Sequence, residues 1–408
     1  MQLRIPTWLL ITSFFAIASQ LAAEDLAPPD PRQRPESPLM LDLITTGTDP
    51  SRIEYATLPR LAGQHGVVSL GDPEWQFRLH NYLAHFAGRF WCFWSHGPVI
   101  EDQARQHLQF ATSDDGITWR PQQVLASPPQ EGYGYIARGL WIRDGELLAL
   151  ASLYEAPAFH DGDLKLMAFR WNSELDAWES AGEIFDNALN NFAPKKLASG
   201  EWMMSRRASD RSVSMLIGGI KAVDDWQVIP FSKYRLPDGG APEEPYWWTL
   251  PGGEIVGMFR DNSKSGRLLR SFSVDNGRTW SPPVRTNFPD ATSKFHGLQT
   301  SRGYWVMASN TNPKQRDPLC LSVSADGMVF QQMYRLPIPA RLEGVDWVDG
   351  SRHGTTRYES VQYPHLIEHA GAIYVAYSRR KQTVEVVRVT LDEVDSAIAR
   401  ELAAISPN

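Results

Sequence analysis

The feature that most constrains the fold is a polar turn motif that occurs three times. Its full form spans residues 273–280 (SVDNGRTW), where the Ser hydroxyl and the Asp carboxylate can accept hydrogen bonds from the amides of their own turn. Gly277 supplies the positive φ that a tight β-hairpin turn needs. Two forms that lack one residue between Asp and Gly span 113–119 (SDDGITW) and 324–330 (SADGMVF). The motif therefore predicts a chain rich in β-hairpins.

The spacing of the three motifs indicates a repeat. They begin at residues 113, 273 and 324, so their starts lie 160 and 51 residues apart. These separations correspond to three units and one unit of roughly 50 residues, a period typical of propellers and other repeat arrays.

Strand-like runs, separated by turns rich in Gly, Asp, Asn and Pro, fill the chain from about residue 40 onward. They form six sets, which span 77–119, 135–178, 192–226, 246–280, 295–330 and 363–389. Six such sets predict an all-β fold, a six-bladed β-propeller that protects its sheet edges by radial repetition. A pair of β-sandwiches is the alternative. We expect a strand from 40–70 to close the last set, and a short C-terminal helix over 391–405.

The N-terminal 23 residues have the pattern of a signal peptide. Arg4 precedes an apolar run over 8–18 that is too short to cross a bilayer comfortably, and Ala22-Ala23 offers a cleavage site. A retained membrane anchor is the alternative. Residues 24–38 are Pro-rich and predict a flexible leader, which leaves 39–408 as the propeller domain. We therefore expect an exported protein, periplasmic or secreted, that is free of the membrane once cleaved.

Composition argues against several classes of function. The formal net charge is -7 and the basic residues are scattered, so nucleic acid is not expected as a partner. No metal-ligand spacing, phosphate loop or Ser-His-Asp arrangement stands out, so we expect no cofactor, and we expect a monomer. Cys92 and Cys320 lie in apolar runs, which favours buried, unpaired thiols over a disulfide.

The motif at 273–280 and its two shorter forms resemble the Asp-box, or BNR repeat, of the sialidase (neuraminidase) superfamily. This resemblance implies a six-bladed propeller whose Asp-boxes lie on outer turns, away from the active face. It also implies a group of functional residues contributed by several blades: three arginines, an acid/base Asp, a Glu and a nucleophilic Tyr.

The first blade offers two of these residues. Residues 78–80 (RLH) stand where sialidases have Arg-Ile-Pro, so Arg78 corresponds to the first arginine of the family. The loop that follows, 97–103, carries the acid/base Asp in sialidases. Asp102 is the candidate here, with Glu101 as its rival.

The later blades offer the other four. Glu244 precedes the first strand of the fourth blade, and Arg260 ends its second strand. Arg316 follows the Asn312-Pro313 turn of the fifth blade, and Tyr363 stands in a Tyr-x-x-Leu context in the last. The six positions occur in the order that the family has.

Chemistry explains why such residues would be grouped. Three guanidinium groups can hold one carboxylate by forked, charge-assisted hydrogen bonds. A neutral Tyr is a poor nucleophile, so Glu244 would take its proton, and Asp102 would protonate the leaving oxygen. A Tyr nucleophile suits an anionic sugar, which would repel a carboxylate nucleophile.

The chain departs from the family's pattern at two places. His80 replaces the Pro of the first blade, and Ser378 stands where sialidases carry a Glu that steadies the first arginine. His80 could contact the ligand or act as a general base, or it could simply pack at the start of a strand.

The sequence thus predicts an exported, retaining exo-glycosidase that removes a terminal acidic sugar, sialic acid or a related acid, from a glycan. One alternative is a lyase or His-dependent hydrolase acting on uronate- or rhamnose-containing polysaccharides, with His80 and Tyr363 as base and acid. Another is a non-catalytic glycan-binding propeller. Further polar residues could line the axis, although most are expected to be structural or solvated: Tyr133, Arg138, Asn191, Lys195, Arg206, Arg207, Lys294, His296 and Asn310. A Gly-containing loop over 343–360 could cover one face.

Overall fold

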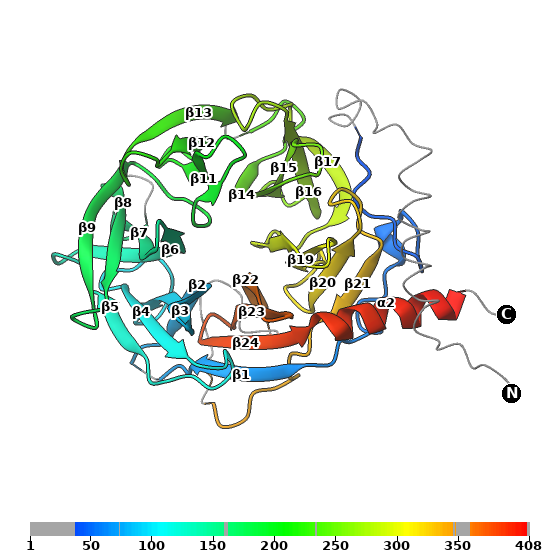
Figure 1. Ribbon diagram of the computed structural model, residues 1–408, viewed down its shortest axis with the longest axis horizontal. Helices are drawn as coiled ribbons and strands as arrows, with labels where there is room; N and C mark the ends of the chain where they lie inside the picture. The colour runs from blue at the N-terminus through cyan, green and yellow to red at the C-terminus, as the bar shows by residue number, and fades with distance from the viewer. Residues whose placement is uncertain are drawn as a thin grey trace, which may run out of the picture.

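A computed structural model describes residues 37–405 except 73, 159–161, 233–234, 346 and 348–359. Within these ranges, six four-stranded antiparallel sheets stand radially around one axis as the blades of a propeller (Figure 1). The predicted all-β class and the predicted number of blades are confirmed.

Blades 1 to 3 are sheets whose strands follow one another in sequence from the axis outward. Blade 1 consists of β2 (Phe77–Phe86), β3 (Arg89–Gly97), β4 (His107–Ser113) and β5 (Gln123–Ala126). Blade 2 consists of β6 (Tyr133–Arg143), β7 (Glu146–Glu155), β8 (Leu164–Asn172) and β9 (Ala177–Asp186). Blade 3 consists of β10 (Lys195–Lys196), β11 (Trp202–Arg207), β12 (Val213–Gly218) and β13 (Trp226–Ser232).

Blades 4 and 5 repeat this order, whereas blade 6 takes its outermost strand from the start of the chain. Blade 4 consists of β14 (Pro242–Thr249), β15 (Ile255–Asp261), β16 (Arg267–Ser273) and β17 (Val284–Pro289). Blade 5 consists of β18 (His296–Gln299), β19 (Trp305–Asn310), β20 (Leu319–Ser324) and β21 (Gln332–Arg335). Blade 6 consists of β22 (Val361–His369), β23 (Ala372–Arg379), β24 (Thr383–Thr390) and β1 (Gln64–Ser69).

The ring is closed by the pairing of β1 with β24. The two strands are antiparallel, and their register runs from Gln64 opposite Arg388 to Ser69 opposite Val384. The closing strand that the sequence predicted is therefore confirmed. Because β1 and β24 lie at opposite ends of the sequence, this one ladder joins the two ends of the propeller domain.

The segment before β1 is bound along the outer edges of blades 4 and 5. The Pro38 carbonyl accepts a hydrogen bond from Asn287 N (2.8 Å), and Leu41 forms a parallel bridge with Phe330. A 3-10 helix, η2 (Pro50–Arg52), follows, with Asp49 as its N-cap. The sequence predicted a flexible leader over residues 24–38. The last residue of this range, Pro38, is held by the propeller through its carbonyl. The predicted signal peptide, the leader up to residue 36 and most of the 343–360 loop lie outside the described residues.

The C-terminal helix α2 (Leu391–Ile405) has the predicted bounds and lies at the rim of the disc (Figure 1). It begins directly after β24, where Thr390 Oγ1 caps it by accepting a hydrogen bond from Glu393 N (3.2 Å). Leu391, Val394 and Ala397 are its buried residues, and they join the apolar cluster of blades 5 and 6. No helix in the described part of the chain is long and apolar enough to cross a membrane.

The three polar turns form the hydrogen bonds that the sequence predicted. Asp115 Oδ1 accepts hydrogen bonds from Ile117 N (2.8 Å) and Thr118 N (2.6 Å), while Ser113 Oγ accepts one from Gly116 N (2.9 Å). The turns at 273–280 and 324–330 repeat this pattern.

The glycine of each turn faces the neighbouring blade closely. A Cβ atom on Gly116 would lie 2.5 Å from the Tyr374 ring of blade 6, and one on Gly277 would lie 2.5 Å from the Met203 sulfur of blade 3. Gly116 and Gly277 also have φ values of 75° and 81°, which favour glycine. The turns therefore do more than reverse the chain, because they also pack one blade against the next.

Cys92 and Cys320 are both fully buried and both free, as the sequence predicted. Each lies in the middle strand region of a blade, Cys92 in β3 and Cys320 in β20. They act as small apolar side chains of the core.

The two adjacent aspartates of the first turn allow a matched test of its role. We expect Asp115→Ala to lower the free energy of unfolding by about 1–2 kcal/mol, because it removes the acceptor of two backbone amides. Asp114 pairs only with the exposed Arg120 (2.7 Å), so Asp114→Ala should change stability by less than about 0.5 kcal/mol. Urea denaturation of the two variants measures the difference. Equal effects would contradict the assigned role of the motif.

Candidate functional site

The innermost strands converge on a cavity of about 280 Å³. All six blades contribute to its lining, which consists of His80, Glu101, Asp102, Ile136, Arg138, Leu189, Asn190, Asn191, Ser205, Arg207, Glu243, Glu244, Pro245, Arg260, Asn262, Arg316, Tyr363 and Lys381. Six of the seven predicted site residues are in this set. The exception is Arg78.

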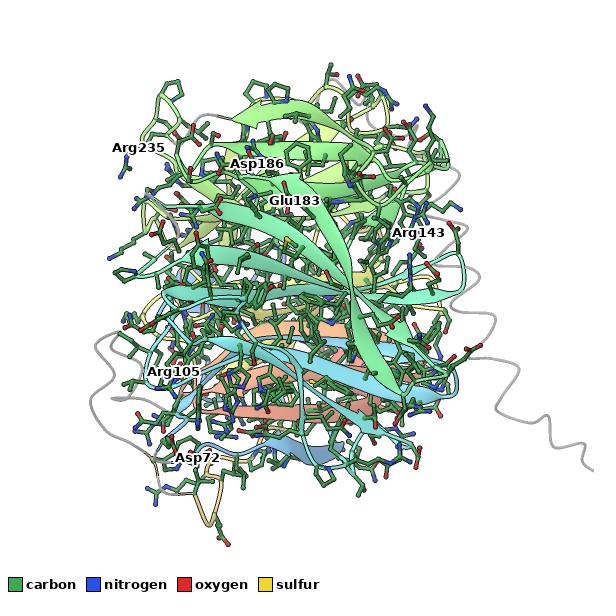
Figure 2. The ribbon with its side chains drawn as sticks, turned by 90° about the vertical axis from the view of Figure 1, so that its left-hand side faces the viewer. Asp72, Arg105, Arg143, Glu183, Asp186 and Arg235 are labelled. Atoms are coloured by element: carbon green, nitrogen blue, oxygen red, sulfur yellow. The ribbon has the colours of Figure 1, made fainter. Side chains whose placement is uncertain are left out.

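The cavity opens on the face of the disc that carries the β3–β4 connection, which includes Glu101 and Asp102. Figure 2 shows Arg105 of this connection on one face and Arg143, at the end of β6, on the opposite face. The turn at 113–119 follows the other end of β4 and so lies on the far face. The polar turn is therefore remote from the cavity, as the resemblance implied.

Three of the innermost strands, β2, β14 and β22, carry the same irregularity beside the cavity. Their registers shift between Leu79 and Tyr82, between Glu243 and Tyr246, and between Gln362 and His365. The first extra residues are His80, Glu244 and Tyr363, with φ values of 55°, 48° and 58°. Side chains other than Gly rarely adopt this conformation, which costs about 1–3 kcal/mol per residue and is typical of functional sites. The bulges aim these three side chains into the cavity.

Tyr363 lies between a carboxylate and a guanidinium. Its Oη atom donates to Glu244 Oε1 (3.4 Å) and accepts from Arg260 Nη1 (3.2 Å), which also contacts Glu244 Oε2 (2.7 Å). Burial, reinforced by the charge of Glu244, raises the pKa of Tyr363 to about 12. Burial alone would raise the pKa of Glu244, but the charges of Arg260 and Lys294 outweigh it and hold that pKa below its ordinary value. A protonated phenol therefore faces an ionised carboxylate.

Glu243 holds two of the cavity's arginines in place. Its side chain is fully buried, and its carboxylate lies 3.1 Å from Arg207 Nη2 and 3.8 Å from Arg260 Nη2. Glu243 and Glu244 are adjacent residues of one bulged strand, β14. Glu243 holds Arg207 and Arg260, and Glu244 contacts Tyr363.

His80 belongs to a second network, on the blade 1 side of the cavity. Ser95 Oγ accepts a hydrogen bond from Ala137 N (2.8 Å). The Ser95 hydroxyl in turn donates its proton to His80 Nδ1 (3.1 Å). The other ring nitrogen, Nε2, then carries a proton that it donates to Glu101 Oε1 (3.1 Å). Lys381 Nζ binds the second oxygen of Glu101 (2.6 Å). Burial lowers the pKa of His80 to about 4, so the imidazole is neutral.

The pKa values of the neighbouring residues Glu101 and Asp102 are shifted in opposite directions. Burial opposes ionisation of Glu101, but Lys381 and His80 keep its pKa well below the ordinary value. Asp102 Oδ1 is buried and has no hydrogen-bond partner among the described residues. Burial and the nearby charge of Glu101 raise the pKa of Asp102 to about 7. Asp102 therefore holds its proton at mildly acidic pH and loses it as the pH rises through about 7.

Arg316 enters the cavity from blade 5. Its Nη2 atom donates to the Thr292 carbonyl (2.7 Å), its Nη1 atom donates to Gln362 Oε1, and its guanidinium carbon lies 5.7 Å from the centre of the Tyr363 ring. Arg260 and Arg316 therefore flank Tyr363 from two blades.

Arg78 does not reach the cavity, so the structure does not match its predicted role in substrate binding. Its buried guanidinium donates to Ser69 Oγ (2.7 Å) and to the Trp75 carbonyl, and lies 3.5 Å from Asp72. The bulge of β2 begins after residue 79, so it turns His80, not Arg78, toward the axis. Ser378, at the position of the family's supporting Glu, accordingly bonds to the Arg78 carbonyl (2.6 Å) instead of its guanidinium.

The comparisons with known proteins agree with this architecture. The model of a family described as BNR repeat-like domain matches residues 184–375. A protein of unknown function from Dyadobacter fermentans shares 14% identity, with a TM-score of 0.60 over 82% of this chain and 100% of its own. The intramolecular trans-sialidase of Ruminococcus gnavus shares 11% identity, with a TM-score of 0.61 over 80% of this chain and 98% of its own.

The chain is a six-bladed β-propeller, and its residues 184–375 match the BNR repeat-like family. A sialidase from Trypanosoma rangeli, solved in complex with sialic acid, shares 14% identity, with a TM-score of 0.58 over 83% of this chain and 61% of its own. No curated protein matches the chain. Likeness at identities this low establishes only the fold of the chain, and its activity has to be argued from the site.

Several residues of the propeller's cavity were not among the predicted site residues. Arg138, Asn191 and Arg207 had been named only as possible axis residues, whereas Glu243 and Lys381 had not been named. Glu243 could have been noticed as the neighbour of Glu244. Nothing in the sequence around Lys381 distinguishes it from a solvated turn lysine, because its partner, Glu101, is 280 residues away. Within the described residues, no cluster of His, Cys, Asp and Glu is arranged to hold a metal ion.

The buried position of Glu243 leads to a stability prediction. We expect Glu243→Gln to lower the free energy of unfolding by about 2–4 kcal/mol, because two partly buried guanidinium groups lose part of the counter-charge that the buried Glu243 supplies. The control is Glu146→Gln, which breaks an exposed ion pair with Arg170 (3.1 Å) and should cost less than about 1 kcal/mol. Chemical denaturation compares them. A loss no larger for Glu243→Gln than for the control would contradict the supporting role.

Proposed function

We propose that this propeller is a retaining exo-glycosidase of sialidase type, which hydrolyses a terminal acidic sugar from a glycan through Tyr363. The observation that carries the proposal is the contact of Tyr363 Oη with both Glu244 (3.4 Å) and Arg260 (3.2 Å) inside a cavity that Asp102 also lines. A nucleophile, its base and an acid are thus present together.

In the first step, Tyr363 Oη attacks the anomeric carbon while its proton passes to Glu244. The glycosidic bond to the leaving oxygen breaks, and Asp102 gives that oxygen its proton. The sugar is then joined to the protein by a covalent bond between its anomeric carbon and Tyr363 Oη. In the second step, Asp102 takes a proton from water and the water oxygen bonds to the anomeric carbon. The bond between that carbon and Tyr363 Oη breaks, and Glu244 returns the proton to the Tyr363 oxygen.

The positive charge beside Tyr363 supports an acidic sugar as substrate. Arg260 and Arg316 come from neighbouring blades and present forked donors on two sides of the nucleophile. An anionic sugar bound there would be repelled by a carboxylate nucleophile but not by a neutral phenol. The likeness in fold to a sialidase solved with sialic acid is in keeping with this choice.

The hydrogen bonds of His80 disfavour the His-based alternatives. Nδ1 is occupied by Ser95 and Nε2 by Glu101, so neither nitrogen has a free lone pair aimed at a substrate proton. His80 lies edge-on to the Tyr363 ring, 5.4 Å between centroids. We assign it a role in packing the nucleophile and holding Glu101.

The location of the proposed reaction follows from the N-terminal pattern of the chain. A charged start, a short apolar run and small residues at 22–23 favour cleavage and export, so glycans of the periplasm or the surroundings are the proposed substrates.

Removal of the nucleophile tests the mechanism. We expect Tyr363→Phe to lower kcat by at least about 10³-fold, while the free acidic sugar still binds because Arg260 and Arg316 remain. The assay is release from fluorogenic α-sialosides and from uronate-rich polysaccharides. Tyr133→Phe, at a tyrosine outside the cavity, should keep full activity. Intact turnover of the preferred substrate by Tyr363→Phe would rule out the mechanism.

The pKa of Asp102 leads to a pH prediction. Because the acid must be protonated, kcat/KM should fall as the pH rises through about 7. In Asp102→Asn this alkaline limb should disappear. The variant should lose about 10²–10⁴-fold on a substrate with an alcohol leaving group, but much less on an aryl glycoside, which needs little protonation. Asp114→Asn, on the far face, is the control. An unchanged alkaline limb in Asp102→Asn would contradict the assignment.

A further inference from the structure

Cationic side chains outnumber carboxyl groups in the lining of the cavity. Five cationic side chains line it: Arg138, Arg207, Arg260, Arg316 and Lys381. Four carboxyl groups also line it, those of Glu101, Asp102, Glu243 and Glu244, and the raised pKa of Asp102, about 7, leaves that group only partly ionised at neutral pH. The lining therefore carries an excess of positive charge around a volume of about 280 Å³.

The excess is located on opposite sides of the cavity. Glu243 and Glu244 are the partners of Arg207 and Arg260, and Glu101 is the partner of Lys381. Within the described residues, Arg138 and Arg316 form no ion pair with a carboxylate. Arg138 comes from β6 of blade 2 and Arg316 from blade 5, and Figure 1 shows β6 and β19 on opposite sides of the axis.

Arg138 has the properties of a ligand-binding group. Only 6% of its surface is exposed, and its Nε atom is buried without a hydrogen-bond partner among the described residues. A guanidinium buried in this way is costly unless an anion neutralises it. The adjacent Asn190 points the same way, because its Oδ1 atom is also buried without a partner while its amide nitrogen holds the Arg138 carbonyl (3.1 Å).

We propose that the cavity binds a doubly anionic sugar, with its first acidic group at Arg260 and Arg316 and a second one, a sulfate ester or carboxylate, at Arg138. Asn190 accepts a hydroxyl hydrogen of the sugar next to the second anion. The inference deepens the proposed function, since it rests on this cavity being the substrate site, but it concerns binding and not turnover. The volume lies at the small end of ligand pockets, as expected for one sugar residue.

The test is a comparison of affinities by isothermal titration calorimetry. The singly charged probes are N-acetylneuraminic acid and glucuronic acid. The doubly charged probes are the O-sulfated forms of each acid, for the sulfate ester, and glucaric acid, for the second carboxylate. We expect the wild-type protein to bind at least one doubly charged probe about tenfold or more tightly than its singly charged parent. Tighter binding of an O-sulfated acid identifies the second acidic group as a sulfate ester, and tighter binding of glucaric acid identifies it as a carboxylate.

Variants of the two unpaired arginines separate the subsites. Arg138→Gln should abolish the preference and leave the affinity for the singly charged probes unchanged, and Arg138→Lys should restore part of it. Arg316→Gln should weaken both kinds of probe alike. The matched control is Arg143→Gln, on the same strand but on the opposite face (Figure 2), which should keep the full preference.

The melting temperature without ligand shows whether Arg138 is merely structural. Because this buried cation has no carboxylate partner, Arg138→Gln should melt at the same or a higher temperature than the wild type. No preference in the wild type, or the same preference in Arg138→Gln, overturns the proposal. Neither result depends on hydrolysis, so failure of the glycosidase mechanism in the Tyr363→Phe assay would be recognised separately.

Discussion

The pairing of β1 with β24 is the interaction on which the rest of the structure depends. A radial array of sheets has no exposed long edge only when the last blade meets the first, and blade 6 obtains its outermost strand from the start of the domain. Closure brings the first strands of six blades to one axis. The cavity exists because of this convergence, since its lining comes from every blade and from residues as far apart as His80 and Lys381.

Within that frame, small departures from regular strand geometry place the reactive groups. The bulges of β2, β14 and β22 each turn one residue with a positive φ into the cavity. Such conformations are unfavourable for His80, Glu244 and Tyr363, so the packed and hydrogen-bonded blades around them must supply the compensating stability. The same geometry that exposes His80 to the cavity keeps Arg78 outside it.

The crowding of charges then sets the chemistry. Glu101 and Asp102 are adjacent in the chain, yet the pKa of Glu101 is lowered because Lys381 and His80 bind it, whereas the pKa of Asp102 is raised because it is buried beside that negative charge. Environments that push the pKa values of neighbouring carboxyl groups apart are a common way to obtain an acid and a base at one pH. In this cavity Glu244 is held ionised by Arg260 and Lys294, and it faces the nucleophile.

The sequence by itself determined the fold, because turn chemistry and strand patterning are local. Ser113, Asp115 and Gly116 bond within their own turn, and the repeat of such turns, together with the strand-like runs, predicted the blades. The patterns of apolar residues predicted the closing strand and α2. The resemblance in chain order also named Asp102, Glu244, Arg260, Arg316 and Tyr363, and the fold brings these five residues into one cavity. Only the tertiary structure decided what Arg78, Arg138 and Lys381 do. Their roles depend on a bulge, on the blade opposite and on a carboxylate 280 residues away, none of which leaves a local mark in the sequence.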